Sequence, residues 1–120
     1  MTSILVVDDD AITKMAIKTV LETLGYVVET VSNGFEALKT LENKKICLIF
    51  LDINMPVMDG HEFVKALRNA DGNIKNIPVI GISAYLDNDG IEKAYQSGMN
   101  KVFKKPISVN QLKEWALNNC

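Results

Sequence analysis

The chain has 120 residues, of which 48% are hydrophobic and 23% charged, and its formal net charge is −2. These values predict one globular domain over residues 1–120, and they exclude a disordered tail and a protein that binds nucleic acid directly through a basic face. The longest apolar run, residues 46–51, is far shorter than the roughly 18 residues of a membrane span. With no signal-peptide pattern at the N-terminus, we expect no membrane insertion and no export.

The two cysteines give a further expectation about the compartment. Cys47 lies inside the apolar run and Cys120 is the last residue. This arrangement does not look like a disulfide framework, so we expect free thiols in a reducing compartment, the cytoplasm.

Short β-branched runs alternate with longer segments of helical period along the whole chain. Helical spacing of apolar residues stops at Gly25, and Pro56 and Gly60 break regular structure in a turn-rich loop. In chain order we expect strand 3–7, helix 11–24, strand 27–31, a helix from the Asn33 cap through Leu41, strand 46–51, loop 54–60, helix 62–69, a turn at 71–73, strand 77–82, helix 87–97, strand 101–103 and helix 109–117.

This alternation predicts the fold class. Strands and helices in strict alternation with short connections favour an α/β fold with a parallel sheet covered by helices on both faces. Five strands in a chain this short suit a flavodoxin-like (βα)5 three-layer sandwich, with a parallel five-stranded sheet of order 2-1-3-4-5. A barrel of eight units would need about twice the residues.

Carboxylates follow two strands that this order makes neighbours. Asp8, Asp9 and Asp10 follow strand 3–7, and Asp52 follows strand 46–51. Like charges at one rim cost free energy unless a cation or proton compensates them, and an oxygen-only ligand set favours Mg²⁺. We therefore expect a magnesium site. Asp10 fits better as the N-cap of the following helix.

Two further groups complete a site suited to a phosphoryl group. Ser83 follows strand 77–82 and Lys105 follows strand 101–103, which adds a hydrogen-bond donor and a cation beside the metal. Asp52 stands alone at the tip of a buried strand and is the natural nucleophile, because carboxylates form aspartyl phosphates.

Taken together, these residues resemble a receiver (response-regulator) domain of two-component and phosphorelay signalling, CheY-like, over the whole chain. The motifs that carry the resemblance are Asp8-Asp9 after the first strand, Asp52 within residues 51–56, Met58-Asp-Gly60, Ser83-Ala84, Gly98 and Lys105-Pro106. Residues 55–60 and 98–100 are similar to those of receivers attached to hybrid histidine kinases.

The resemblance implies roles for the acidic residues. Asp52 would accept a phosphoryl group from a histidine kinase or a histidine phosphotransfer protein. Asp8 and Asp9 would hold Mg²⁺, with Asp9 and Asp52 binding it directly and Asn54 adding its backbone carbonyl. Such a domain is not an enzyme in the usual sense, since it catalyses only its own phosphorylation and dephosphorylation.

The resemblance also implies roles at the other strand ends. Ser83 would bond to the phosphoryl oxygens, Lys105 would pair with the phosphate, and a cis peptide bond would precede Pro106. The fourth helix, fifth strand and fifth helix would signal to an effector domain or protein. Many receivers carry an aromatic switch residue where this chain has Val102, and alternation points Phe103 to the other face, which puts the aromatic-switch mode of activation in doubt.

Other residues of chemical interest have plainer interpretations. Tyr85 is expected to lie over the phosphorylation site and to slow hydrolysis. His61 is expected to be structural or at the surface, and residues 87–90 to begin a helix instead of binding calcium.

The alternative function is enzymatic. A haloacid-dehalogenase-type phosphatase also uses an Asp-x-Asp after its first strand, which Asp8 and Asp10 would supply with Asp8 as the nucleophile. That alternative leaves Asp52 without a role, and the chain is short for such an enzyme.

Overall fold

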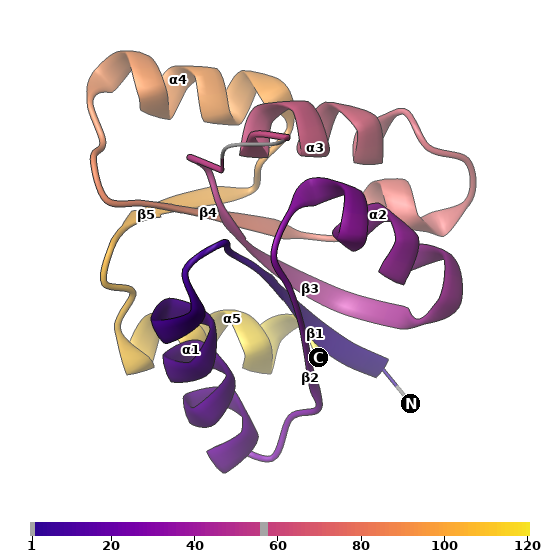
Figure 1. The fold of residues 1–120 in the computed structure, drawn as a ribbon, viewed down its shortest axis with the longest axis vertical. Helices are drawn as coiled ribbons and strands as arrows, with labels where there is room; N and C mark the ends of the chain where they lie inside the picture. Colours follow the sequence, from indigo (N-terminus) through magenta and orange to yellow (C-terminus); the bar gives the residue numbers. More distant parts are fainter. Residues whose placement is uncertain (1, 56–57) are drawn as a thin grey trace.

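The computed structural model describes residues 2–55 and 58–120, so Pro56 of the predicted loop lies outside the described residues. Strands and helices alternate along the chain (Figure 1). They are β1 (Thr2–Val7), α1 (Ala11–Thr23), β2 (Val28–Val31), α2 (Gly34–Asn43), β3 (Lys45–Asp52), α3 (Gly60–Arg68), the 3-10 helix η1 (Asn73–Asn76), β4 (Val79–Ser83), α4 (Asn88–Ser97), β5 (Lys101–Lys104) and α5 (Val109–Asn119).

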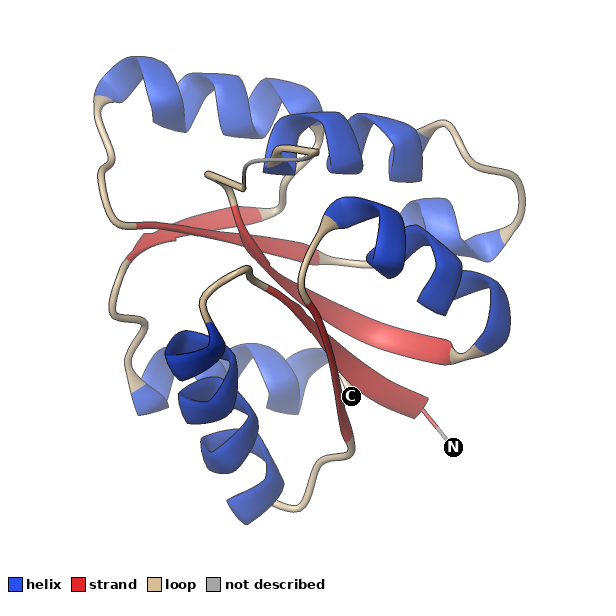
Figure 2. Cartoon of the chain, viewed as in Figure 1, coloured by secondary structure: helices blue, strands red, loops and turns tan. Residues whose placement is uncertain are grey.

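The five strands form one parallel sheet in the order β2-β1-β3-β4-β5. Figure 2 shows α1 and α5 on one face of this sheet and α2, α3 and α4 on the other. The flavodoxin-like three-layer fold predicted from the sequence is therefore confirmed. Among residues 2–55 and 58–120, no helix is long and apolar enough to cross a membrane.

The core has two halves, which the alternation of side chains along the strands separates. On β3, Ile49 and Leu51 belong to the cluster under α2, α3 and α4, whereas Leu48 and Phe50 belong to the cluster under α1 and α5. All four side chains are fully buried. A central strand buried on both faces is held in register by both clusters, so the position of the residue at its tip, Asp52, is fixed.

Each α-helix begins at a polar residue whose side chain accepts a backbone N–H of the first turn, which satisfies donors that have no partner within the helix. The predicted caps Asp10 and Asn33 are confirmed. Asp87 caps α4, which confirms that residues 87–90 start a helix. Asp59 and Ser108 cap α3 and α5 in the same way.

The side chain of Arg68, at the end of α3, joins three segments that follow it in the chain. Its guanidinium donates to the carbonyl oxygens of Gly98, Lys75 and Ile77 and to the side-chain oxygen of Asn100, over 2.7–3.0 Å. The planar fork of arginine can serve four acceptors at once, which lysine cannot do. Arg68 therefore holds α3 to the end of α4 and to the start of β4.

One expectation from the sequence is wrong. Cys47 of β3 and Cys120 at the end of α5 form a disulfide, with their Cα atoms 5.7 Å apart. The two residues are 73 positions apart in sequence, and their proximity arises only because α5 packs back across β3. The expectation of a reducing compartment therefore loses its basis in the cysteines.

Candidate functional site

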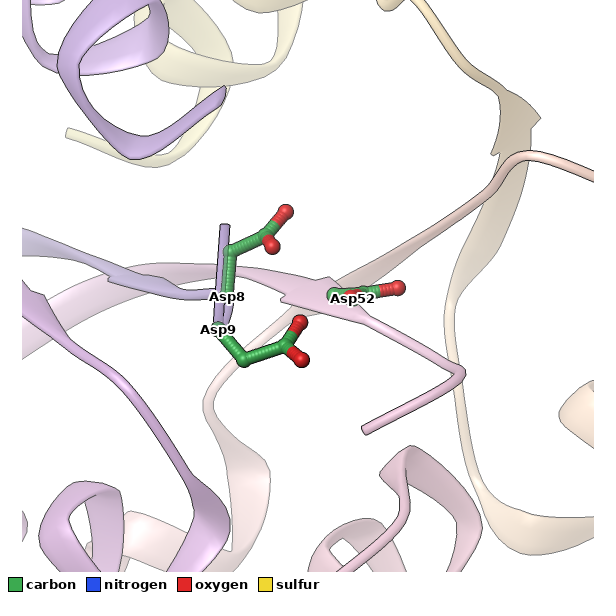
Figure 3. Close-up of side chains that lie close together, drawn as sticks. All are labelled: Asp8, Asp9 and Asp52. Carbon is green, nitrogen blue, oxygen red and sulfur yellow. The ribbon is translucent and has the colours of Figure 1, made fainter. Parts of the chain in front are cut away.

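The strand order brings three carboxylates to one rim of the sheet. Val7 of β1 pairs with Leu51 of β3, so Asp8 and Asp9 leave β1 beside Asp52 at the tip of β3. One oxygen from each of the three lies within 4.8 Å of the others. Figure 3 shows the three side chains gathered at the ends of the two strands, as the sequence predicted.

The three carboxylates differ in exposure. Asp8 and Asp52 are only 2% and 5% exposed, whereas Asp9 is open to solvent. Burial and then the charge of Asp8 raise the pKa of Asp52 from 3.8 to about 6, although the Asn54 backbone amide and Lys105 act in the opposite direction. The Asp52 carboxylate is therefore held in a site that does not fully compensate its charge.

Lys105 supplies positive charge at this rim. Its backbone N–H donates to the Ser83 carbonyl over 2.8 Å, which ties the end of β5 to the end of β4. Its ammonium lies 3.1 Å from Asp8 Oδ2 and 3.6 Å from Asp52 Oδ2. Burial lowers the pKa of Lys105, but the hydrogen bond to Asp8 and the charge of Asp52 outweigh burial and raise it. The predicted cis peptide bond between Lys105 and Pro106 is present.

Ser83 is bonded within the rim, away from the carboxylates. Its hydroxyl accepts a hydrogen bond from Asn54 Nδ2 and donates one to the Tyr85 carbonyl, each over 2.8 Å. Sequence reasoning assigned Asn54 only a backbone role and missed its side-chain contact, which no spacing in the sequence indicates. The side chain of Tyr85 is 76% exposed.

The acidic site has the chemistry of a magnesium site. Oxygens of three carboxylates lie together, and the Lys105 ammonium pairs with those of Asp8 and Asp52. The three carboxylates offer hard oxygens, the type of ligand that Mg²⁺ prefers. The raised pKa of Asp52 indicates that nearby positive charge does not fully offset the negative charge of the site, and a divalent cation would compensate the remainder. Asp8, Asp9 and Asp52 therefore fit the ion, whereas Asp10 is occupied as the cap of α1.

Three predictions near the site concern packing. Val102 packs against the core cluster under α2, α3 and α4, and Phe103 packs against the opposite cluster, as strand alternation predicted. The position of the aromatic switch thus has an aliphatic side chain. His61 is buried on α3, which agrees with the structural role expected of it.

Comparison with known proteins assigns the chain to a family of signalling domains. It is 32% identical over 111 residues to the sensor histidine kinase RcsC of Salmonella typhi and 35% identical over 111 residues to the hybrid signal transduction protein dokA of Dictyostelium discoideum. Each alignment covers 92% of this chain but only 11% and 6% of the two relatives. The chain therefore spans a small part of the length of either protein.

Solved structures agree with this assignment. The chemotaxis protein CheY4 of Vibrio cholerae is 28% identical with a TM-score of 0.89, over 100% of this chain and 99% of that one. A signal receiver domain of a histidine kinase from Syntrophus aciditrophicus is 29% identical with a TM-score of 0.87, over 97% of this chain and 87% of that one. The phosphatase alternative with Asp8 as nucleophile finds no support among these relatives. Residues 4–116 match the response regulator receiver domain, and the chain belongs to this family of phosphoacceptor signalling domains.

Proposed function

We propose that Asp52 is the phosphoacceptor of a single receiver domain over residues 1–120. The observation that carries this proposal is the position of Asp52, buried at the tip of a central strand with two other carboxylates and Lys105 around it. A carboxylate in such a site is a nucleophile that a metal ion and an ammonium can orient toward a phosphoryl group.

The metal ion would be held by residues of the same rim. Asp9 and Asp52 would bind Mg²⁺ directly, Asn54 would add its backbone carbonyl, and Asp8 would complete the acidic set. When bound, Mg²⁺ supplies positive charge that offsets the carboxylates and the phosphoryl oxygens. The proximity of the Asp8, Asp9 and Asp52 oxygens supports this arrangement.

In the transfer step, a carboxylate oxygen of Asp52 attacks the phosphorus of a phosphohistidine. The P–N bond breaks as the P–O bond forms, and its electron pair leaves with the imidazole, which takes a proton from solvent. Lys105 Nζ, 3.6 Å from Asp52 Oδ2, pairs with a phosphoryl oxygen of the product. Hydrolysis of the acyl phosphate by water returns the carboxylate, so the domain catalyses only its own modification and its reversal.

Ser83 would connect this chemistry to the surface. To donate to a phosphoryl oxygen, its hydroxyl has to give up the hydrogen bond to the Tyr85 carbonyl. Tyr85 lies in the loop between β4 and α4, so loss of this hydrogen bond would free that loop from Ser83. This change needs no aromatic residue at position 102, where the chain has Val102. We infer that α4, β5 and α5 transmit this change to an effector domain or protein.

The phosphodonor would be a histidine kinase or a histidine phosphotransfer protein. The chain would act in the cytoplasm, where ATP is the source of the phosphoryl group. The start of α1 lies beside the acidic rim, because Asp10 caps this helix directly after Asp8 and Asp9. There Ile12 is 80% and Met15 65% exposed, and Ile12, Ala16 and Ile107 help to line a groove of about 260 Å³ that adjoins Lys105. We infer that an apolar surface of the donor docks on this groove.

Ile12→Glu tests the docking surface. It should slow phosphotransfer from a phosphorylated histidine phosphotransfer domain that is active on the wild type, and leave phosphorylation by acetyl phosphate unchanged, because the small donor needs no docking surface. Leu117→Glu is the matched control, since Leu117 is 69% exposed near the far end of α5. Equal transfer rates for the Ile12→Glu variant and the wild type would contradict the docking assignment.

Acetyl phosphate with Mg²⁺ tests the phosphoacceptor. The wild type should acquire an acyl phosphate that is lost on alkaline hydrolysis, and chelation of the metal before acetyl phosphate is added should prevent its formation. Asp52→Asn should abolish the labelling, and Asp10→Asn, which removes a neighbouring carboxylate but keeps a capping side chain, should leave it intact. Labelling that survives Asp52→Asn but disappears in Asp8→Asn would refute the assignment.

A further test concerns the lifetime of the phosphoryl group. Tyr85 follows Ser83 by two positions, and it is exposed. Tyr85→Ala should shorten the phosphoryl lifetime if the ring obstructs water. An unchanged lifetime would refute this role.

A further inference from the structure

The phosphoryl site makes no use of the disulfide between Cys47 and Cys120. Cys47 lies near the start of β3, at the opposite end of the strand from Asp52. Cys120 follows α5 directly, and its backbone N–H continues the helical bonding by donating to the Ala116 carbonyl over 2.8 Å. The link therefore joins the far end of the strand that carries Asp52 to the far end of the helix that follows Lys105.

A β-bulge positions Cys47 for this link. Ser3 pairs with Ile46 and Ile4 pairs with Leu48, so Cys47 is the extra residue of β3 and has no partner on β1. As a result, Cys47 and Leu48 both belong to the side of the sheet that α1 and α5 cover. Bulges redirect side chains in this way, and here the bulge directs a thiol toward α5.

The helix presents the second cysteine through its own periodicity. Leu112 and Ala116 are the buried residues of α5, at 2% and 0% exposure, and Cys120 follows at the same spacing of four. Residues four apart lie on one face of a helix, so Cys120 continues the stripe that faces the sheet. The two cysteines therefore meet because the bulge of β3 and the buried stripe of α5 both direct them toward the contact between this strand and this helix.

The surroundings of Cys47 and Cys120 suit both the disulfide and the two reduced thiols. Cys120 is an exposed residue. Cys47 Sγ lies 3.3 Å from the Ser3 carbonyl oxygen, which can accept a hydrogen bond from the Cys47 thiol once the disulfide is reduced. Reduction therefore leaves the Cys47 thiol beside a hydrogen-bond acceptor, and the phosphoryl site lies at the opposite end of β3.

We propose that Cys47 and Cys120 form a redox-active pair, which exchanges electrons with external disulfides and dithiols and reversibly fixes the end of α5 to β3. In oxidation, the exposed Cys120 thiolate attacks an external disulfide and releases one thiol. The Cys47 thiolate then attacks Cys120 Sγ in the mixed disulfide and expels the second thiol. Two electrons and two protons pass from the pair to the external disulfide, and a dithiol reverses the exchange. The proposal is independent of the phosphoacceptor assignment.

The first test is exchange itself, with oxidised glutathione as the probe. The reduced wild type should lose both free thiols and retain no bound glutathione, as measured by alkylation and mass spectrometry. Cys47→Ser should instead accumulate a mixed disulfide at Cys120, because the second thiolate is missing. A wild type that retains stable glutathione adducts or two free thiols would refute the pair.

The second test is the restraint on α5. A link across 73 residues should raise the melting temperature of the oxidised protein over the reduced one by roughly 8–16 °C. Amide exchange should rise on reduction in residues 112–120 and change least around Asp52. Cys120→Ser is the matched control, with a melting temperature that does not respond to dithiothreitol. A melting temperature of the wild type that is equally insensitive would contradict the proposal.

Discussion

Replacement of Asp52 by Asn should stabilise the protein in the absence of metal, although it removes a residue at the centre of the site. Asp52 is buried, and desolvation followed by the charge of Asp8 raises its pKa from 3.8 to about 6. A group whose pKa is raised by folding contributes stability below its unfolded pKa, and this contribution is lost as the pH rises through the folded value. Ionised Asp52 is therefore a cost of folding above pH 6.

The size of this cost follows from the shift. A rise from 3.8 to about 6 corresponds to roughly 3 kcal/mol between the two protonation states. Relaxation of the site and screening by salt reduce the effect of a charge at a rim. We therefore expect Asp52→Asn to raise the free energy of unfolding at pH 8 by about 1–3 kcal/mol, and to have little effect near pH 4.

Urea unfolding in EDTA at pH 4 and pH 8 measures this difference. The control is Asp10→Asn, which removes an exposed carboxylate of the same rim but keeps a capping oxygen, so its effect should stay below about 0.5 kcal/mol. Saturating Mg²⁺ should stabilise the wild type more than Asp52→Asn. A variant that is as stable as the wild type at pH 8, or less stable, would refute the electrostatic reasoning.

Three other substitutions test the scaffold around the site. Asp10→Ala should cost about 1 kcal/mol of unfolding free energy and leave Mg²⁺ affinity intact, because Asp10 caps α1; a loss of metal affinity would contradict that role. Arg68→Lys should cost about 2–3 kcal/mol in chemical denaturation, since lysine cannot reproduce the bonds to Gly98 and its neighbours; a cost below about 0.5 kcal/mol would show that these bonds are dispensable. Burial and the charge of Lys93 hold the pKa of His61 below its ordinary 6.5, so the unfolded state binds the extra proton and stability falls as the pH drops below that value. The melting temperature of Asp52→Asn should fall between pH 7.5 and 5, and adding His61→Gln to this variant should make the fall smaller. An equal fall in both variants would rule out His61 as its source.

The fold could be predicted because the patterns that indicate its strands and helices involve residues that are near one another in the sequence. The alternation of β-branched runs with helical periods fixed the order of elements, and the observed ends of most elements lie within one or two residues of the expected ones. The 3-10 helix η1 was missed because four residues are too few for a periodic pattern. β4 begins at Val79, two residues later than expected, since Pro78 lacks the N–H that a strand ladder uses.

The acidic site could also be predicted, because the strand order alone brings Asp8, Asp9 and Asp52 to one rim. The hydrogen bond from Asn54 Nδ2 to Ser83 Oγ joins the ends of two neighbouring strands, β3 and β4. No pattern in the sequence indicates which side-chain atoms meet there.

The disulfide was missed for a different reason. Leu112, Ala116 and Cys120 share a helical stripe, and this signal was available in the sequence. The signal for Cys47 was not, because it depends on a bulge that appears only when β1 and β3 are paired. Strand pairing in three dimensions therefore decides which thiols meet.

The most direct test of Asp52 as the phosphoacceptor is the position of the phosphoryl group after reaction with acetyl phosphate and Mg²⁺. Borohydride reduces an aspartyl phosphate to homoserine, so peptide mapping of the trapped wild type identifies the acceptor residue. We predict homoserine at position 52, with aspartate retained at positions 8 and 9. Homoserine at position 8 or 9 with Asp52 intact would contradict this assignment.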